Sequence, residues 1–558
     1  MTDLKIDRPD STPDELPSPE YETLDARVDR RSFLTRMGAL GAAGVALAQL
    51  PPVRARAAGY SGSSMPKVAV RPEVLADPTE ATIAEATTLI ARKQLTPSEL
   101  TEAYLERIRL YDTDYWQAYY TVLADESRAA AAQLDRASKP VGLLHGVSVP
   151  VKDNFYTKGI LTTAQSLIFA DFVPDVDATA VARIKAAGGI ILGKLQMGPL
   201  AGGRPRNPAT GEITTRNAWS PDDPGPTPSG SSGGSGACTA ARLATCSLGT
   251  QTGGSITGPG QSNGLTALKP THGLCSVFGV IPLTITRDHI GPLARDAMDA
   301  AIVTTVIGGP AREDFRTLNL PRIPNLIGAA TPVVWKGRVA PRWRLRVGVP
   351  AGFTDGTTPT ALARAAMLDV LANIGYQIVP VTIPEEYALL NGGAFNVSST
   401  ERGEMDFKYM KEDVRLFGDR LTGWISALFI DGATANKGLR CRQRAYDLAY
   451  SELWTQCDVV FSTTGFDALG FPLCTLPIGF APNAAGIVLP IATTLGGPSF
   501  GEEKILSVIA AYQAATTFHL RRPPNPTIGL ARASDPRTPR LRMNSRSVDA
   551  EIAATALA

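Results

Sequence analysis

Two serine clusters set among glycines constrain the fold of this chain more than any other feature. The first occupies residues 230–235 (GSSGGS) and the second occupies residues 249–256 (GTQTGGSI). Glycine lets a backbone approach a ligand closely and adopt φ/ψ values that other residues avoid. A serine held in such a loop can present its hydroxyl beside several unpaired backbone N–H groups. The clusters therefore offer the components of a nucleophile with an oxyanion hole.

A flexible Gly/Ser linker is the simplest alternative for the first cluster. The residues that follow argue against it, because residues 237–244 (ACTAARLA) form a helix-prone run with Ser235 as a predicted N-cap. The chain then turns inward through residues 246–248 and reaches a second Gly-Gly-Ser. A linker would not resume in this way, so we interpret both clusters as parts of one folded site.

A lysine stands at the end of a predicted buried strand. Apolar residues at Val147, Val149 and Val151 alternate along the segment, a pattern typical of a strand. This strand delivers Lys152 at or near its end, and lysine is rarely buried without a reason. Taken alone, an exposed lysine at a strand end is the simpler interpretation of this motif.

Composition narrows the chemistry that the chain can perform. The chain has 558 residues, a formal net charge of +2 and scattered basic residues, so we expect no nucleic-acid partner. It has only four histidines, and its six cysteines form no CxxC pair, which disfavours a metal site. We therefore expect no metal and no cofactor. We expect most cysteines to be buried thiols, and the sequence leaves any disulfide pairing open.

The first 57 residues resemble an export signal. Residues 1–29 are polar and predicted to be disordered, and Arg30-Arg31 precede an apolar run at 37–50. The run is too short for a permanent membrane anchor, and residues 55–57 match an A-x-A cleavage site. This order resembles a Tat signal, and a buried helix with a chance Arg-Arg is the alternative. We expect a mature protein from about Ala58 that works in the periplasm or outside the cell, without a stable membrane anchor.

Strand and helix patterns alternate from residue 80 to residue 522 without a long linker. This alternation favours one large α/β domain, which we place at residues 58–523. Within it, residues 310–340 are predicted to be a long irregular connection. Residues 385–455 are predicted to be mostly helical and to cover a substrate pocket. A Pro/Arg-rich tail follows at residues 524–558 and is expected to be loosely held.

Four motifs, taken in order, resemble the amidase signature family of serine hydrolases. They are VPVKDN at 149–154, the two serine clusters, and LKPT at 268–271. The resemblance spans residues 82–523, and it includes a block formed by Asp288 and Gly291-Pro292. Each motif alone is weak, whereas the ordered set is highly specific. The resemblance implies an α/β fold in which a mixed β-sheet core is sandwiched between helices.

The resemblance also implies a Lys–cis-Ser–Ser triad. Carried over by motif, Lys152 is the base, Ser231 is the bridging cis-serine and Ser255 is the nucleophile. A lysine can act as a base only if burial lowers its pKa enough to make the neutral amine accessible. A hydroxyl both donates and accepts, so Ser231 can relay a proton from Ser255 to Lys152. The predicted oxyanion hole consists of the backbone N–H groups of Thr252, Gly253, Gly254 and Ser255.

Two positions depart from the family pattern. Gln251 stands where an acidic residue is usual, and Thr257 stands where an arginine is common after Ser-Ile. The usual residues help to buttress the loop. Losing both together avoids leaving one charge unpaired. We interpret the departures as a joint substitution that leaves the triad in place.

The nucleophile elbow of α/β-hydrolases is the rival interpretation. Residues 230–234 fit G-x-S-x-G with Ser232 as the nucleophile. That motif needs a strand directly before it, and the prolines at 224, 226 and 228 preclude a regular central strand. We therefore reject the rival. The remaining histidine candidates are then predicted to be structural: His272, His289 and His519.

The sequence predicts an exported amidase that hydrolyses a carboxylic acid amide to an acid plus an amine or ammonia, through an acyl-enzyme on Ser255. An ester or carbamate hydrolase on the same triad is the alternative, since the acyl-enzyme chemistry is shared. The intact Lys152, Ser231 and Ser255 disfavour a non-catalytic binding protein, and the export signal disfavours a transamidosome component. The expected partner is a small-molecule amide. The acyl and amine parts of the substrate and the oligomeric state stay open.

Overall fold

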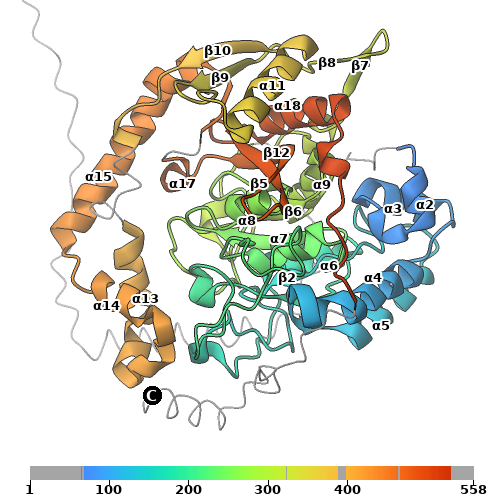
Figure 1. Ribbon diagram of the computed structural model, residues 1–558. Coiled ribbons are helices and arrows are strands. Elements are labelled where there is room, and N and C mark those ends of the chain that lie inside the picture. The colour runs from blue at the N-terminus through green and yellow to red at the C-terminus, as the bar shows by residue number, and fades with distance from the viewer. Residues whose placement is uncertain (1–64, 66–67, 322, 388–396, 463–464, 529–558) are drawn as a thin grey trace, which may run out of the picture. The chain divides into compact units, whose positions relative to one another are not determined.

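The computed structural model describes residue 65 and residues 68–321, 323–387, 397–462 and 465–528 (Figure 1). These residues belong to one structural unit of the chain, Ala55–Ala558. The predicted signal segment and the tail beyond residue 528 lie outside the described residues. The domain boundaries that we place at residues 58 and 523 therefore stay predictions.

Eleven strands of the described residues form one mixed sheet, and two further strands form a separate hairpin. The strands of the large sheet lie in the order β1 (Tyr119–Val122), β3 (Gly193–Leu195), β2 (Val151–Lys152), β4 (Ser247–Gln251), β6 (His289–Ala294), β5 (Thr266–Lys269), β12 (Leu473–Pro482), β13 (Val488–Gly496), β11 (Val459–Val460), β9 (Arg346–Pro350) and β10 (Gln377–Val381). Strands β2 and β4 are parallel, whereas β4 and β6 are antiparallel. The carboxyl ends of parallel neighbours meet at one sheet edge, so Lys152 and Gln251 end adjoining strands.

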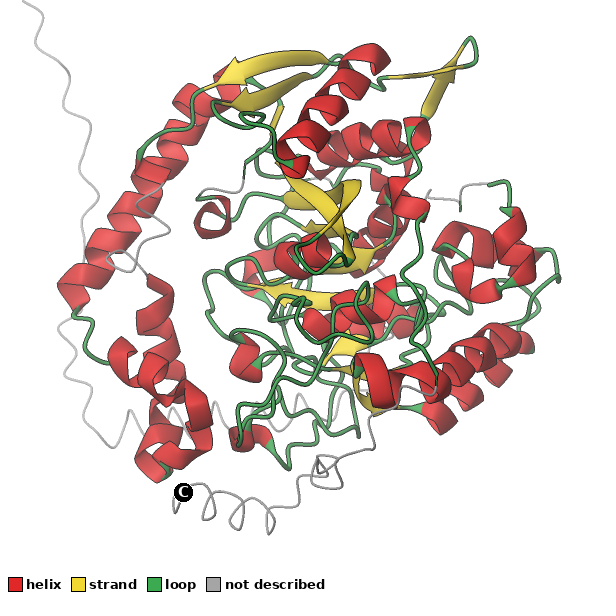
Figure 2. Cartoon of the chain, viewed as in Figure 1, coloured by secondary structure: helices red, strands yellow, loops and turns green. Residues whose placement is uncertain are grey.

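The central strands of the sheet are buried on both faces. Every residue of β4, β5 and β6 is buried, although successive side chains of a strand point to opposite faces. Both faces must therefore be covered, and helices surround these strands in Figure 2. This confirms the predicted fold class, an α/β domain with a mixed sheet sandwiched between helices.

Sixteen α-helices of the described residues lie between the strands and at either end of them along the chain. They are α2 (Pro72–Ala76), α3 (Ile83–Ala91), α4 (Pro97–Tyr111), α5 (Ala124–Asp135), α6 (Thr179–Ala186), α7 (Gly233–Ala240), α8 (Thr257–Ser262), α9 (Ala297–Ile307), α10 (Leu326–Ala329), α11 (Pro359–Ile374), α13 (Val397–Glu412), α14 (Leu421–Ala427), α15 (Gly432–Leu448), α16 (Trp454–Gln456), α17 (Phe466–Leu469) and α18 (Glu502–Ala515). Among the helices of the described ranges, none has both the length and the hydropathy needed to cross a bilayer. Helix α4 shows how local sequence starts such an element. Thr96 and Glu99 form a capping box, Pro97 is the first helical residue, and the apolar stripe at Leu100 and Tyr104 is wholly buried.

The first serine cluster leads into helix α7, but not at the residue that we expect. The helix begins at Gly233 with Ser232 in the N-cap position, so the prediction of Ser235 as N-cap is wrong. Ser235 lies in the first turn, where its Oγ donates to the Leu248 carbonyl at 3.0 Å. A Cβ added at Gly234 would lie 2.4 Å from the Gln196 carbonyl oxygen, so only glycine lets this turn pack so closely. The helix therefore starts early because Gly234 packs closely against Gln196 while Ser235 bonds to β4.

Residues 310–340 are more regular than the sequence indicates. Strands β7 (Val333–Trp335) and β8 (Arg338–Ala340) form an antiparallel hairpin. Lys336 and Gly337 make its turn, and both have positive φ, at 51° and 77°. A two-residue turn with positive φ at both positions matches the twist of a hairpin, and the residues of β7 have high β propensity. The prediction of an irregular connection is therefore wrong for these residues.

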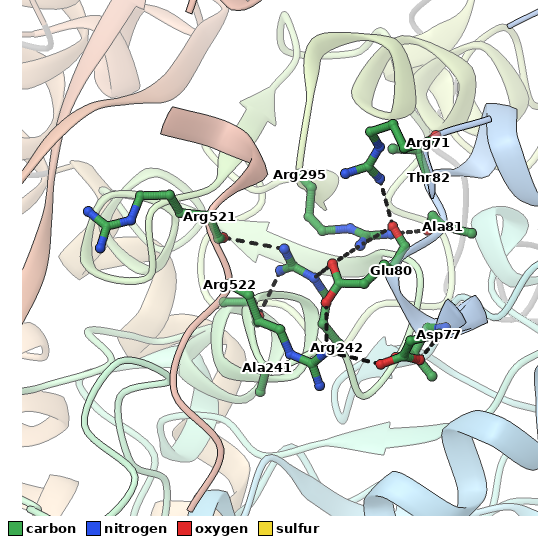
Figure 3. A network of polar contacts seen from close by, with 12 residues as sticks. Arg71, Asp77, Glu80, Ala81, Thr82, Ala241, Arg242, Arg295, Arg521 and Arg522 are labelled. Atoms are coloured by element: carbon green, nitrogen blue, oxygen red, sulfur yellow. Dashed lines mark hydrogen bonds and ion pairs between the residues drawn. The ribbon is translucent and has the colours of Figure 1, made fainter. Parts of the chain in front are cut away.

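A buried ionic network ties the N-terminal part of the described residues to the end of α7 and to the C-terminal segment (Figure 3). The Glu80 carboxylate lies at its centre, 2.9 Å from Arg242, 2.9 Å from Arg522 and 3.9 Å from Arg295. Arg295 also donates to the carbonyls of Glu80 and Ala81. Four segments that are far apart in the sequence thus meet at one carboxylate.

The charge balance of this network favours the ionised carboxylate. Burial raises the pKa of Glu80, but attraction to Arg242, Arg295 and Arg522 outweighs burial and the net pKa is lowered. The side chains of Arg242 and Arg295 are only 3% and 4% exposed. Removing the carboxylate would leave these buried guanidinium groups without this negative counter-charge, which costs more than the intact pair contributes.

We predict that Glu80→Ala lowers the free energy of unfolding by about 3–5 kcal/mol. Because folding lowers the pKa of Glu80, its stabilising contribution is complete above pH 4.5, the ordinary pKa of glutamate, and declines as the pH falls further. Chemical unfolding at neutral and acidic pH measures both effects. Glu106→Ala, which removes the partner of Arg109 on the exposed surface, is the control and should change stability little. Equal effects of the two substitutions would contradict this role for Glu80.

Candidate active site

Lys152 is wholly buried and is surrounded by hydroxyl groups. It ends β2, where its side chain is 0% exposed. Its Nζ lies 2.7 Å from Ser231 Oγ and 2.7 Å from Thr250 Oγ1. The Thr250 carbonyl lies 3.4 Å away, and Asn154 donates to the same Thr250 hydroxyl at 3.3 Å. The sheet therefore places the amine against the first serine cluster and the strand that leads to the second.

Burial makes the neutral amine of Lys152 accessible. Desolvation lowers the pKa of Lys152 to about 7, although the carboxylate of Asp288 raises it in part. An amine with this pKa is substantially unprotonated at neutral pH, so it can accept a proton there. This is the electrostatic condition that a lysine base requires.

Ser231 contacts the amine, and its neighbour Ser232 contacts the second cluster. The Gly230–Ser231 peptide bond is cis, and Ser231 is 1% exposed. Its hydroxyl faces Lys152 Nζ and, as a hydroxyl, can donate one hydrogen bond while it accepts another. The next residue, Ser232, donates from its backbone N–H to the Ser255 carbonyl at 3.3 Å. This bond holds the loop of Ser231 against the loop of Ser255.

Ser232 is placed differently from a nucleophile. Its hydroxyl donates to the Thr250 carbonyl at 3.1 Å and accepts from the Thr250 N–H at 3.3 Å. The side chain is wholly buried, and among the described residues no strand lies directly before Gly230. The nucleophile-elbow interpretation therefore lacks its structural context.

Ser255 lies at the accessible end of its cluster. It is half-buried, between Gly253, which is exposed, and helix α8. Gly254 has a φ of +96°, a conformation that favours glycine. In the part of the chain that the structure describes, the backbone N–H groups of residues 252–255 donate to no protein acceptor. This segment therefore has unpaired donors beside the Ser255 hydroxyl.

Gln251 buttresses this loop in place of the usual acidic residue. Its Oε1 accepts from Ile256 N at 2.7 Å, from Thr257 N at 2.8 Å and from Thr257 Oγ1 at 3.2 Å. Its Nε2 donates to Asp467 Oδ1 at 2.6 Å. An amide can serve both sides, because its oxygen accepts from the loop while its nitrogen donates to α17. Gln251 and Thr257, the two residues that depart from the family pattern, thus contact one another.

Asp288 supports the same loop from the opposite side. Its carboxylate accepts from the hydroxyl of Thr252 and from the backbone N–H groups of Leu283 and Thr284, at 2.7 and 3.0 Å. Burial raises the pKa of Asp288, against the lowering effect of these hydrogen bonds and of Lys152. The carboxylate therefore holds Thr252 in place. It also partly offsets the lowering of the Lys152 pKa.

The helical segment at residues 397–448 contacts this supporting loop. Glu401 of α13 accepts from Thr286 N at 3.0 Å and from Thr286 Oγ1 at 2.6 Å. Arg442 of α15 donates to the Thr286 carbonyl at 3.1 Å. Both helices thus hold a residue two positions before Asp288. That the segment covers a substrate pocket, as predicted from the sequence, stays a prediction.

The cysteines and histidines make other contacts than those of Lys152 and Ser231. All six cysteines are free thiols, and only Cys441 is not fully buried. Within the described ranges, no group of histidine, cysteine and acidic side chains is arranged to hold a metal ion. His289 faces the Gln251 and Arg287 carbonyls through Nδ1, and its ring packs edge-on against His272. These contacts are those of packed, structural histidines.

Sequence reasoning missed three supporting residues. Thr250 lies within the second cluster, and its hydroxyl group was the only sequence signal for a role beside Lys152. Thr286 and Asp467 lie in segments without a motif, and only the fold brings them to the loop. Their roles depend on tertiary contacts that local sequence does not specify.

The chain is similar to known proteins along most of its length. The sequence profile of the family described as Amidase matches residues 99–477. The chain is 32% identical over 499 residues to the A subunit of a glutamyl-tRNA(Gln) amidotransferase from Geobacter sp. (strain M21), covering 79% of this chain and 99% of the relative. It is 33% identical over 491 residues to the protein of the same name from Roseiflexus castenholzii, covering 79% and 97%.

This chain belongs to the Amidase family. The amidase is a hydrolase that acts on amide C–N bonds. Its fold matches the native peptide amidase of Stenotrophomonas maltophilia, with a TM-score of 0.67 and 26% identity over 80% of this chain and 98% of that one. It has the fold of 6-aminohexanoate cyclic dimer hydrolase as well, with a TM-score of 0.66 and 21% identity over 81% and 100% of the two chains.

We predict that Gln251→Glu lowers kcat/KM of the amidase at least about tenfold, because it sets a second carboxylate against Asp467 and displaces the loop. A carboxylate oxygen of the new side chain can accept from Ile256 and Thr257 as the amide oxygen does. The fall in kcat/KM therefore measures the effect of the changed contact with Asp467. Adding Asp467→Asn should restore most of the activity, since the amide then donates to the carboxylate. Steady-state kinetics of the two single variants and the double variant measure this. A double variant no better than Gln251→Glu alone would contradict the contact's role.

Proposed function

We propose that the amidase hydrolyses its substrate through an acyl-enzyme on Ser255, with Lys152 as the base and Ser231 as the proton relay. The observation that carries the proposal is the wholly buried Lys152 amine, 2.7 Å from Ser231 Oγ. A backbone hydrogen bond links the neighbouring Ser232 to Ser255. Lowering of the Lys152 pKa to about 7 supports the role of base at neutral pH.

In the acylation step, the neutral amine of Lys152 takes the proton of Ser231 as Ser231 takes the proton of Ser255. Ser255 Oγ then forms a bond with the amide carbonyl carbon. The oxyanion that develops accepts from the N–H groups of residues 252–255, which face no protein acceptor among the described residues. The proton returns from Lys152 through Ser231 to the amide nitrogen as the C–N bond breaks. Amine or ammonia leaves, and Ser255 retains the acyl group as an ester.

The deacylation step repeats the relay with water as the nucleophile. Lys152, through Ser231, takes a proton from the attacking water, and the C–O bond to Ser255 breaks as Ser255 regains its proton. The carboxylic acid is released. Esters give the same acyl-enzyme as amides, and carbamates give the related carbamoyl-enzyme. Rates for an amide and an ester that share one acyl group, and for a carbamate of similar size, therefore distinguish the preferences. We propose the amide as the preferred substrate, and small molecules as the substrate class.

We predict that Ser255→Ala abolishes covalent labelling by a fluorophosphonate and lowers kcat/KM by about 10³–10⁶-fold. Lys152→Ala should lower it by about 10²–10⁴-fold, as expected for the loss of a general base. Ser232→Ala is the matched control, because the Ser232 hydroxyl bonds only Thr250 and should leave labelling intact. Mass spectrometry of the labelled peptide identifies the modified serine. Labelling that persists without Ser255 and disappears without Ser232 would overturn the assignment.

We propose further that the amidase is exported by a Tat-type signal and works in the periplasm or outside the cell. The support is the order of Arg30-Arg31, the apolar run at 37–50 and the A-x-A site at 55–57. An exported enzyme would act apart from a tRNA-dependent complex. The relatives named as amidotransferase subunits therefore do not supply the proposed partner, and we propose no nucleic-acid partner.

We predict that replacing Arg30 and Arg31 by lysine keeps the protein in the cytoplasm, because the twin arginine is the part of the signal that the export machinery reads. Fractionation of cells that produce the full chain measures this, and N-terminal sequencing of the exported form should begin near Ala58. Arg27→Lys, just outside the motif, is the control and should leave export unchanged. An exported double-lysine variant, or a cytoplasmic parent chain, would contradict the prediction.

A further inference from the structure

The β7–β8 hairpin ends in a short, rigid turn. Val334 of β7 lies opposite Val339 of β8, and Trp335 lies opposite Arg338. Lys336 and Gly337 alone connect the strands, with φ of 51° and 77°. Two-residue turns of this kind hold the flanking residues in a fixed geometry. Figure 1 shows the hairpin extending beyond α11 and α18, apart from the large sheet.

The two strands of the hairpin differ in burial. On β8, Val339 is half-buried and packs against the hydrophobic core. On β7, Val334 is 63% exposed, and Trp335, next to the turn, is 69% exposed. An isolated exposed apolar residue is ordinary on a protein surface. Here two neighbouring apolar side chains, one of them tryptophan, occupy the tip of a rigid projection.

The charged residues in the sequence around this tip are of one sign. Residues 315–354 contain no aspartate or glutamate and seven lysines or arginines, although the whole chain has 53 acidic and 55 basic residues. Arg316 and Arg346, toward the ends of this stretch, pair with acidic side chains outside it. Lys336, Arg338 and Arg344 are exposed on or next to the hairpin. The local excess of positive charge is therefore concentrated where Trp335 is exposed.

We propose that the β7–β8 hairpin is a peripheral contact with an anionic phospholipid surface. Tryptophan partitions to the headgroup level of a bilayer, where its ring is buried and its N–H stays hydrated. Lysine and arginine beside it are attracted to anionic headgroups, each contributing about fivefold to the binding constant. Trp335 and Val334 enter the headgroup region, and Lys336, Arg338 and Arg344 contact the phosphates. Such a contact is reversible, because three cations and one tryptophan do not form a permanent anchor.

A second copy of this chain fits the hairpin less well. Two tips of the same positive charge would repel one another across a symmetric contact, and strands of three residues leave few backbone groups for edge pairing. A nucleic acid, like an anionic lipid surface, binds cations and aromatic rings. Single strands, however, are held in grooves with several stacking rings, and this tip presents one. The charge and shape therefore favour the lipid surface.

Sedimentation of the full chain with vesicles tests the proposal. Vesicles of phosphatidylglycerol and phosphatidylcholine in equal parts are compared with vesicles of phosphatidylcholine alone. Trp335→Ser should weaken binding to the anionic vesicles by about tenfold, and Lys336→Glu/Arg338→Glu should weaken it by about 25-fold or more. Binding should also decline at high salt. Arg136→Glu/Lys139→Glu, which reverses two exposed cations after α5, is the matched control and should bind like the parent chain.

Fluorophosphonate labelling of Ser255 checks that each variant is folded, since the hairpin takes no part in the triad. Folded hairpin variants that bind the anionic vesicles as tightly as the parent would overturn the proposal. So would equal binding to the uncharged vesicles, which the apolar run at 37–50 could produce alone. Loss of self-association or of oligonucleotide binding in the hairpin variants, without vesicle binding by the parent, would assign the hairpin to a second copy or to a nucleic acid instead.

Discussion

A lysine amine buried among hydroxyl groups is the interaction on which the rest of this structure depends. Three lysines of the described residues are wholly buried, and they are stabilised in different ways. Lys194 lies 3.3 Å from the Asp153 carboxylate, and Lys269 donates to the Phe471 carbonyl beside His289. Lys152 instead faces the hydroxyls of Ser231 and Thr250, so desolvation lowers its pKa to about 7 without a carboxylate in contact to restore it. The sheet thus creates a basic amine where the two serine clusters meet.

The loop that carries Ser255 is held by residues from distant parts of the chain. Gln251 accepts from the loop and donates to Asp467, while Asp288 fixes Thr252. Helices α13 and α15 in turn hold Thr286, two residues before Asp288. A loop whose backbone N–H groups must stay unpaired cannot stabilise itself through its own hydrogen bonds. Its geometry is therefore supplied by side chains around it, which is why the C-terminal half of the chain matters to a site built mainly from the N-terminal half.

The fold class could be predicted from the sequence, because the ordered motifs and the alternation of strands and helices are local signals. The capping box at Thr96 and the strand that ends at Lys152 are examples. Lys152 and Ser231 are in contact, as the motifs suggest, while the roles of Lys152, Ser231 and Ser255 stay predictions. Positions that depend on packing could not be predicted. Helix α7 begins before Ser235 because the glycines at 233 and 234 fit closely against neighbouring backbone and side chains. The hairpin at 333–340 could not be predicted because its turn is Lys-Gly rather than the commoner Asn-Gly or Asp-Gly pair. The role of Asp467 carries no sequence signal at all.

The central claim is that acylation of Ser255 requires the neutral amine of Lys152. The pH dependence of the rate at which a fluorophosphonate labels Ser255 tests this most directly, since labelling isolates the acylation step from product release. Because the base is active when unprotonated, the rate should rise about tenfold per pH unit below pH 7 and become constant above it, following the pKa of about 7 for Lys152. A rate that continues to rise through pH 9 and 10, as for an ordinary lysine, would contradict the account.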